Sequence, residues 1–269
     1  MKNKNHFLSV IVPVYKQSKT IRQDLFTIVD TLNQIRYDYE IIAVVDGTLV
    51  DNSFSEASKC HLKKLKIIGY PNNHGKGYAL RYGMAHTKGD YIAFIDAGME
   101  IDPNGISMIL EHLEWYNADI IVGSKRHPAS IINYPLNRKI LSFFAWIFAK
   151  YLLNINVHDT QAGLKIFKRQ VLEKVLPRLL VKNYAIDLEI LSVANHLGFT
   201  KIFEAPIKLS YDFHSLSGSF DIIYRTLIDA LAIFYRLHLL NYYDDNNQRK
   251  WVLDPELNMR VNTGEYEKK

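Results

Sequence analysis

The chain has 269 residues, 48% of them hydrophobic, and a formal net charge of +5. Its single cysteine, Cys60, excludes an internal disulfide framework and favours a reducing compartment. Lys and Arg are scattered and no nucleic-acid recognition motif accompanies them. The positive charge would permit nucleic-acid binding, but this scatter argues against it, and a basic surface beside apolar helices fits an anionic membrane face better.

Short β-branched runs alternate with helical patterns over the N-terminal half of the chain. Strands are expected at Phe7–Val14, Glu40–Val45, Leu65–Gly69, Tyr91–Ile95 and Asp119–Val122, with helices near 18–35, 76–87 and 103–116. The first run meets Pro13 and Tyr15 rather than a cleavage site of small residues, which indicates a strand and not a signal peptide. The alternation predicts an α/β fold with a mostly parallel sheet flanked by helices.

Carboxylates follow two of these expected strands. Asp96 and Glu100 come after Tyr91–Ile95, and Asp46 follows the second strand in an Asp-Gly turn. In open α/β sheets, ligands bind at the carboxyl ends of the strands. Carboxylate oxygens suit Mg²⁺ or Mn²⁺, and such an ion is most useful beside a diphosphate. A solvated Asp turn is the alternative interpretation.

A glycine-flanked lysine, Lys76, stands between Gly75 and Gly77 just ahead of a predicted helix. Flexible backbone at a helix N-terminus suits phosphate oxygens. The spacing is not that of a Walker A loop, because the Lys-Ser/Thr pair is absent. By itself the motif is compatible with either a phosphate-binding loop or an ordinary loop.

Taken together and in this order, these motifs resemble the family 2 glycosyltransferases, and within them most closely the polyprenyl-phosphate (dolichyl-phosphate) glucosyltransferases and mannosyltransferases. The resemblance extends from residue 7 to about residue 240. The Gly-Lys-Gly loop and the later Asp-Thr-Gln-x-Gly-x-Lys motif lean toward the glucosyl branch. The matching segments are Ile11–Tyr15, Val45–Thr48, Asn73–Gly77, Gly89–Ala97 and Asp159–Lys165.

The resemblance implies a GT-A (Rossmann-like) fold and a nucleotide site at one end of the sheet. Pro13, Tyr15 and Asp46 would line the nucleotide-base pocket, and Lys76 would lie near the nucleotide. The chain departs from the family pattern at Lys16-Gln17, where Asn-Glu is usual.

The resemblance also implies a divalent metal, Mg²⁺ or Mn²⁺, as cofactor. Asp96 matches the first acid of the family's Asp-x-Asp metal motif, but Gly98 stands in place of the second acid. Glu100, two residues further on, is expected to complete the metal site with Asp96.

Acceptor-side residues are expected in the second half of the chain. Asp159 begins the Asp-Thr-Gln-x-Gly-x-Lys motif and Asp187 matches another acid of the family pattern, so Asp96, Asp159 and Asp187 are the catalytic candidates. Asp187 and Glu189 would both lie in the first turn of a helix, favourable to its dipole. Arg126 and Arg138 are expected near an acceptor phosphate, because guanidinium groups pair well with phosphate oxygens.

Three regions are expected: a GT-A domain over 1–218, an amphipathic helix over 219–242 that packs on the domain or lies on a membrane, and an extended or mobile polar tail over 243–269. The apolar run Leu141–Ala149 is shorter than the roughly 20 residues that span a bilayer, and is compatible with a core or an interfacial helix. Charged residues also interrupt 220–240. The expected location is therefore peripheral, on the cytoplasmic face of a membrane.

The expected reaction is inverting transfer of a hexose, glucose or mannose, from a UDP- or GDP-sugar to a polyprenyl phosphate. A membrane-protein partner and a homo-oligomer both remain open. One alternative is a family 2 transferase that acts on a sugar hydroxyl in surface polysaccharide synthesis, with Asp159 or Asp187 as general base. Another is a catalytically impaired sugar-nucleotide-binding protein, in which Gly98 in place of the second metal-binding acid would explain the lost activity.

Overall fold

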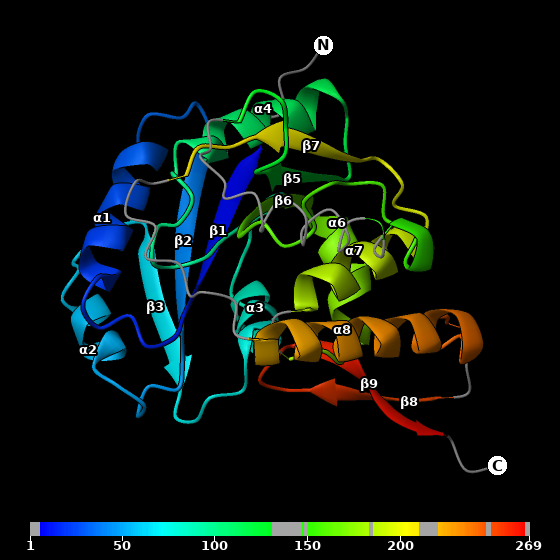
Figure 1. Ribbon diagram of the computed structural model, residues 1–269. Coiled ribbons are helices and arrows are strands. Elements are labelled where there is room, and N and C mark those ends of the chain that lie inside the picture. The colour runs from blue at the N-terminus through cyan, green and yellow to red at the C-terminus, as the bar shows by residue number, and fades with distance from the viewer. Residues whose placement is uncertain are drawn as a thin grey trace.

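A mixed sheet forms the centre of the computed structural model, which describes residues 6–130, 147, 150–182, 185–209, 220–245 and 249–266 (Figure 1). Within these residues the sheet has seven strands in the order β3-β2-β1-β4-β6-β5-β7. The strands are β1 (Phe7–Val14), β2 (Asp38–Asp46), β3 (Leu65–Tyr70), β4 (Tyr91–Ile95), β5 (Ile120–Ser124), β6 (Leu164–Lys168) and β7 (Ile202–Pro206).

Strand direction confirms the expected mostly parallel α/β sheet. The neighbours β1–β2, β2–β3, β1–β4 and β5–β7 run parallel, and β6 runs antiparallel to both β4 and β5. All residues of β4 and β5 are buried, as expected for strands covered on both faces. Because β6 is reversed, its first residue, Leu164, pairs with Ile95 at the carboxyl end of β4. The segment that precedes β6 is thereby placed at the edge where Asp96 lies.

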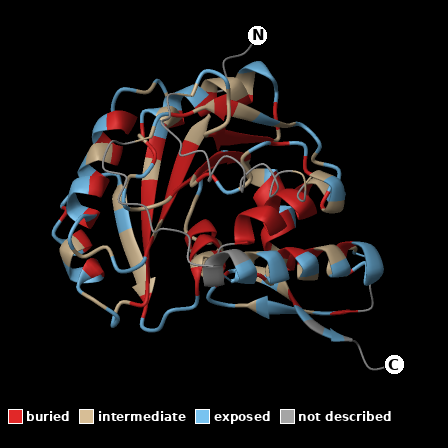
Figure 2. Cartoon of the chain, viewed as in Figure 1, coloured by how far each residue is buried: buried red, intermediate tan, exposed pale blue. Residues whose placement is uncertain are grey.

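Helices cover the sheet, as Figure 1 shows, and Figure 2 shows the buried residues concentrated in the strands and in α7. Helix α1 buries Ile21, Leu25, Ile28 and Leu32, which share one face of a 3.6-residue helix. Helix α3 approaches β1 closely at Gly83, where an added Cβ would lie 2.7 Å from a methyl carbon of Ile11. The helices are α1 (Ile21–Leu32), α2 (Ser53–Ser58), α3 (Lys76–Met84), α4 (Gly105–Trp115), α6 (Arg169–Val175), α7 (Ile186–His196) and α8 (Phe220–Phe234).

The C-terminal region is folded, and the expectation of an extended tail is wrong. After α8 and a π-helical turn, η2 (Tyr235–Leu239), strands β8 (Arg249–Asp254) and β9 (Met259–Tyr266) form an antiparallel hairpin. Its connecting turn buries Leu257 and receives a hydrogen bond from α3, donated by the Tyr78 hydroxyl to Glu256 at 2.7 Å. Trp251 lies under the Arg178 guanidinium, 5.1 Å from ring centroid to Cζ. These contacts hold the hairpin on the domain.

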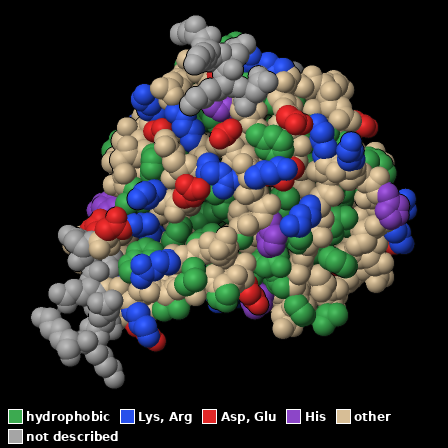
Figure 3. Space-filling view, turned by 180° about the vertical axis from the view of Figure 1, so that it is seen from behind, with side chains coloured by type: hydrophobic (Ala, Val, Ile, Leu, Met, Phe, Trp, Pro, Cys, Tyr) green, Lys and Arg blue, Asp and Glu red, His purple; other side chains and the backbone are tan. Residues whose placement is uncertain are grey.

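Two expectations concern membranes and surface charge. In the part of the chain that the structure describes, no helix combines the length and apolarity needed to cross a bilayer. Most of the apolar run Leu141–Ala149, and Arg138 before it, lie outside the described residues. On the face seen in Figure 3, the described Lys and Arg side chains are interspersed with Asp and Glu. The division into regions at 218 and 242 stays a prediction.

Candidate active site

Asp46, at the end of β2, organises the loop that leads into α3. Its carboxylate accepts hydrogen bonds from the Asn73 side-chain amide at 2.7 Å, the His74 N–H at 2.7 Å and the Gly75 N–H at 3.0 Å. The residue is buried. Because three donors of the loop converge on one carboxylate, Asp46 fixes the path of the glycine loop. Its expected place in a nucleotide-base pocket stays a prediction.

The two glycines around Lys76 are needed for close packing. Gly75 has φ +90°, and a Cβ there would lie 2.5 Å from the Lys182 carbonyl oxygen. A Cβ at Gly77 would lie 2.5 Å from the Val181 carbonyl oxygen, and the Gly77 N–H donates to the Lys182 carbonyl at 3.1 Å. Only glycine allows this approach and this backbone conformation. The loop therefore holds Lys76 at the first position of α3.

Lys76 joins two of the predicted catalytic acids. Its Nζ lies 2.9 Å from Asp96 Oδ1, at the end of β4, and 3.1 Å from Asp187 Oδ2, in the first turn of α7. The other oxygen of Asp187 is 2.8 Å from Lys165 Nζ, on β6. We call these four residues the Lys76 cluster. They come from α3, β4, β6 and α7, which meet at the carboxyl edge of the parallel strands.

The electrostatics of the cluster follow from its burial and pairing. Burial acts to lower the pKa of Lys76, but the negative charges of Asp187 and Asp96 outweigh it, so the pKa is raised and Lys76 is protonated. Burial acts to raise the pKa of Asp187, but the charges of Lys165 and Lys76 outweigh it and the pKa is lowered. A carboxylate held between two ammonium groups with a lowered pKa is a poor proton acceptor. The contacts therefore speak against Asp187 as a general base.

Lys165 was missed as a site residue, although it ends the Asp-Thr-Gln-x-Gly-x-Lys motif. Its side chain is 1% exposed, and its ammonium also donates to the Ala162 carbonyl. The available signal was a lysine between the apolar residues Leu164 and Ile166, because a fully buried lysine requires a partner of opposite charge. That partner is Asp187, which is distant in sequence.

Gly163, just before β6, gives the Asp96 carboxylate its space. A Cβ at Gly163 would lie 2.6 Å from Asp96 Oδ2, and the Asp96 N–H donates to the Gly163 carbonyl at 3.1 Å. This small-residue contact places the carboxylate where Lys76 reaches it.

The position of the missing second acid has a backbone that favours glycine. Gly98 has φ +91°, and its N–H donates at 3.0 Å to Asp24, a buried residue of α1. Burial raises the pKa of the Asp24 carboxyl, against the hydrogen bonds from Gly98 and Thr20. An aspartate at 98 would therefore be strained in this loop, whatever the space around it.

Glu100 and Asp159 belong to a second group at the end of β5. Glu100 Oε1 lies 3.1 Å from Lys125 Nζ, and the Lys125 N–H donates to Asp159 Oδ2 at 3.0 Å. The Asp159 N–H in turn donates to Glu204 at 3.1 Å. Arg126 follows in the chain, with its N–H on the Ser124 hydroxyl at 3.2 Å. We call Glu100, Lys125 and Asp159 the Lys125 cluster.

Two predicted base-pocket residues, Pro13 and Tyr15, lie at the end of β1 and just after it. Pro13 is the penultimate residue of β1, paired in register with Val44 of β2. Tyr15 follows the strand with 44% of its surface exposed, and the Lys16 ammonium lies 5.2 Å from its ring centroid. An exposed ring after a strand end is available to stack on a base.

Asp96 offers a divalent metal one carboxylate oxygen that no hydrogen bond in the described part of the chain occupies. Among the described residues, Asp96 Oδ1 is buried and receives no hydrogen bond of acceptable geometry, although Lys76 Nζ lies 2.9 Å away. No group of three or more His, Cys, Asp or Glu side chains in the described ranges is placed to hold a metal ion. Mg²⁺ is commonly held by one or two carboxylates together with substrate phosphates, and one carboxylate is what this edge provides. Glu100 is engaged by Lys125 instead.

Solved structures with this architecture define the class of fold, which is GT-A. Mannosyl-3-phosphoglycerate synthase from Rubrobacter xylanophilus superposes with a TM-score of 0.67 at 16% identity, covering 98% of this chain and 87% of its own. Glucosyl-3-phosphoglycerate synthase from Mycobacterium tuberculosis, crystallised with Mn²⁺, UDP-glucose and phosphoglyceric acid, has a TM-score of 0.62 at 15% identity, covering 92% and 84%.

The chain belongs to glycosyl transferase family 2, whose model matches residues 9–176. Dolichyl-phosphate beta-glucosyltransferase of Drosophila melanogaster is 31% identical over 209 residues, which are 71% of this chain and 63% of the relative. The protein of that name from Dictyostelium discoideum is 29% identical over 72% and 63%. The one from Saccharomyces cerevisiae is 28% identical over 90% and 78%. This chain thus spans just under two thirds of the fly and slime-mould relatives.

Proposed function

We propose that this chain is an inverting glycosyltransferase that moves glucose from a nucleotide diphospho-sugar, UDP- or GDP-linked, to a polyprenyl phosphate. Its relatives are named for transfer of glucose to dolichyl phosphate. The observation that carries the proposal is the Lys76 cluster, which presents a protonated lysine and the Asp96 carboxylate at the carboxyl edge of the sheet.

The reaction is an in-line displacement. An oxygen of the acceptor phosphate attacks the anomeric carbon from the side opposite the diphosphate. The bond between that carbon and the diphosphate oxygen breaks with its electron pair, and the anomeric configuration inverts. Lys76, fixed by Asp96 and Asp187, lies where it stabilises the charge that grows on the leaving diphosphate. When bound at Asp96, Mg²⁺ or Mn²⁺ would neutralise part of the same charge.

The contacts of the two candidate bases, Asp187 and Asp159, support a phosphate acceptor. A lipid phosphate is anionic near neutral pH and needs no general base, whereas a sugar hydroxyl does. Asp187 has both oxygens held by lysines, and Asp159 accepts the Lys125 N–H. These contacts favour the phosphate over the hydroxyl acceptor. Lys125 and Arg126, after β5, are the described cations that we assign to the acceptor side.

We also propose that the protein works on the cytoplasmic face of a membrane, with α8 against the lipid. One face of α8 packs on the domain through Ala230 and Ile233, which are buried. The other face, continued by the first residue of η2, carries large apolar side chains that are 43% to 64% exposed, next to Arg225: Tyr224, Leu227, Ile228, Leu231 and Tyr235. An apolar face with a flanking cation suits an anionic interface. Flotation with anionic vesicles tests this, and binding that survives Leu227→Glu with Leu231→Glu would contradict it.

The function is tested by measuring release of UDP or GDP from a panel of nucleotide sugars, with Mg²⁺ or Mn²⁺, with and without a short-chain polyprenyl phosphate. Release that needs both UDP-glucose or GDP-glucose and the lipid phosphate is the expected result. Release with a hydroxyl acceptor alone would indicate the polysaccharide alternative. Nucleotide binding without release under any condition would indicate the impaired binding protein.

A further inference from the structure

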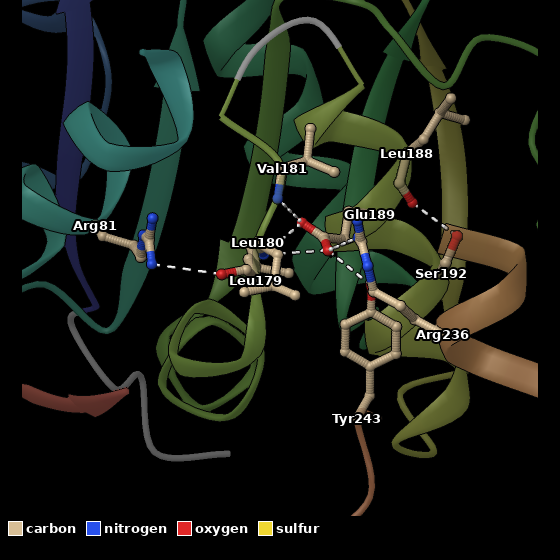
Figure 4. Close-up of polar contacts among 9 residues, drawn as sticks. All are labelled: Arg81, Leu179, Leu180, Val181, Leu188, Glu189, Ser192, Arg236 and Tyr243. Atoms are coloured by element: carbon tan, nitrogen blue, oxygen red, sulfur yellow. Dashed lines mark hydrogen bonds and ion pairs between the residues drawn. The ribbon is translucent and has the colours of Figure 1, made fainter. Parts of the chain in front are cut away.

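A second carboxylate of α7, Glu189, is fully buried and saturated with hydrogen-bond donors (Figure 4). It accepts the Leu180 N–H at 3.0 Å and the Val181 N–H at 2.8 Å. It also accepts the Tyr243 hydroxyl at 2.7 Å and Arg236 Nη1 at 3.3 Å. Every partner is a donor, so the arrangement requires the carboxylate as an acceptor. Such a network offsets the cost of burying the group.

The backbone that Glu189 holds is the same backbone against which the glycine loop packs. On its other side, the Leu179 carbonyl accepts Arg81 Nη1 at 3.4 Å, and the Lys182 carbonyl accepts the Gly77 N–H at 3.1 Å. Arg81 belongs to α3 and also donates to the Gly77 carbonyl at 3.2 Å. Residues 179–182 therefore lie between α7 and the start of α3, with N–H groups held from one side and carbonyls from the other.

Asp187 and Glu189 are two residues apart, so their side chains leave α7 about 200° apart around the helix axis. Asp187 contacts Lys76 directly. Glu189 contacts the segment that sets the position of the loop carrying Lys76. One helical turn thus controls the lysine by two routes, one electrostatic and one through backbone packing.

We infer that Glu189 is a positioning residue for Lys76, acting through residues 179–182, and that Arg236 and Tyr243 connect it to the C-terminal segment after α8. Glu189 is not a catalytic residue, because its hydrogen bonds go to Leu180, Val181, Arg236 and Tyr243 and to no member of the Lys76 cluster. The kinetic part of this inference rests on the proposed glucosyl transfer. The structural part, the restraint of the glycine loop, does not.

Hydrogen–deuterium exchange of the whole chain tests the restraint without any substrate. Glu189→Gln keeps the shape of the side chain but leaves one acceptor oxygen for four donors, so either the backbone N–H groups or Arg236 and Tyr243 lose their acceptor. We expect exchange to rise roughly tenfold in peptides covering 72–84 and 179–182, since amides exchange through local opening. Ser192→Ala is the control, because Ser192 is buried on the same helix and donates to the Leu188 carbonyl, outside the network. It should leave both peptides unchanged.

If Glu189→Gln does not fold, Tyr243→Phe provides the second variant, because it removes the 2.7 Å hydroxyl bond and keeps the ring. We expect a rise of roughly threefold in the same peptides. A folded Glu189→Gln or Tyr243→Phe protein with wild-type exchange at 72–84 would overturn the inference, whether or not the chain transfers glucose.

In the transfer assay, Glu189→Gln should lower kcat about tenfold with an unchanged pH profile, since a misplaced group near the reacting atoms costs rate. Unchanged kcat with raised exchange would restrict the role of Glu189 to the fold and overturn the kinetic part. If neither the wild-type chain nor the variant turns over, the proposed function fails while the exchange result still stands.

Discussion

The charged clusters at the ends of β4 and β5 contain the same kinds of residue but differ in burial and pairing. In the Lys76 cluster, the Asp187 carboxylate is 7% exposed and both of its oxygens contact lysines. In the Lys125 cluster, the exposed Glu100 carboxylate meets one lysine at 3.1 Å, much as the partly exposed Asp96 carboxylate meets Lys76. The clusters therefore differ in the buried Asp187–Lys165 pair. Buried pairs are rigid and costly to break, whereas exposed pairs contribute little and exchange partners easily. The Asp187–Lys165 pair therefore preorganises the first cluster for a fixed charge, whereas the exposed Glu100 carboxylate of the second can change its contacts when an acceptor binds.

Breaking the buried pair should have the largest effect. Asp187→Asn removes the counter-charge of Lys165 and Lys76, and we expect it to lower the free energy of unfolding by about 3–5 kcal/mol, because an uncompensated buried charge remains. Urea unfolding monitored by circular dichroism measures this. A loss below about 1 kcal/mol would show that the two clusters are alike.

The difference in unfolding free energy between the wild type and Asp187→Asn should depend on pH. The pKa of Asp187 is lowered in the folded state, so its contribution is fully present above the unfolded value of about 3.9 and is lost as the pH falls through the folded value. The stability gap between wild type and Asp187→Asn should be constant from about pH 7 to pH 5 and should narrow below about pH 4. A gap that widens on acidification would have the wrong sign.

Removing the lysine should affect catalysis more than folding. Lys76→Met takes away the cation proposed to face the leaving diphosphate, and we expect kcat to fall about 10²–10³-fold, as for loss of one preorganised charge-stabilising group. Lys59→Met, which removes an exposed ion pair with Glu56, is the matched control and should leave kcat unchanged. Equal rates for the two variants would remove Lys76 from the mechanism.

Crowding Asp96 should have an intermediate effect. Gly163→Ala places a Cβ 2.6 Å from Asp96 Oδ2, so the carboxylate must move, and we expect about 1–3 kcal/mol of lost stability with reduced activity. Gly105→Ala is a milder comparison, since its nearest neighbours are apolar side-chain atoms at 3.0 Å or more. Thermal unfolding and the transfer assay measure both. Unchanged stability and activity in Gly163→Ala would show that the Asp96 carboxylate does not need the space that Gly163 leaves.

The smallest effect is expected at the exposed cluster. Glu100→Gln should change the free energy of unfolding by no more than about 0.5 kcal/mol, because the Glu100 carboxylate is solvent-exposed. Titration of Mn²⁺ in the presence of UDP, followed by electron paramagnetic resonance, decides whether Glu100 also binds metal. Unchanged Mn²⁺ affinity would restrict the metal site to Asp96, and a loss of tenfold or more would restore Glu100 as a ligand.

The strands could be predicted from the sequence because they are continuous runs of apolar, often β-branched residues. Tyr91–Ile95 was predicted with the bounds that β4 has. Lys165 and Glu189 were not predicted as functional, because a buried charge is recognised only through partners that the fold supplies. Asp187 pairs with Lys165 across two elements, and Glu189 meets Tyr243 from the C-terminal segment. The β8–β9 hairpin was missed because polar residues dominate its sequence, while single residues such as Leu257 anchor it.

The position of β6 has a consequence for how the chain folds. In the sheet it lies between β4 and β5, although both precede it in sequence, so these two strands cannot be joined until residues 164–168 have been synthesised. Pairings between distant segments form slowly, because loop closure must come first. Since β6 also carries Lys165, closing the sheet brings this lysine to the edge where Asp187 of α7, which follows in the chain, pairs with it. A nascent chain that ends before β6 would expose the sides of β4 and β5 to aggregation or to chaperones.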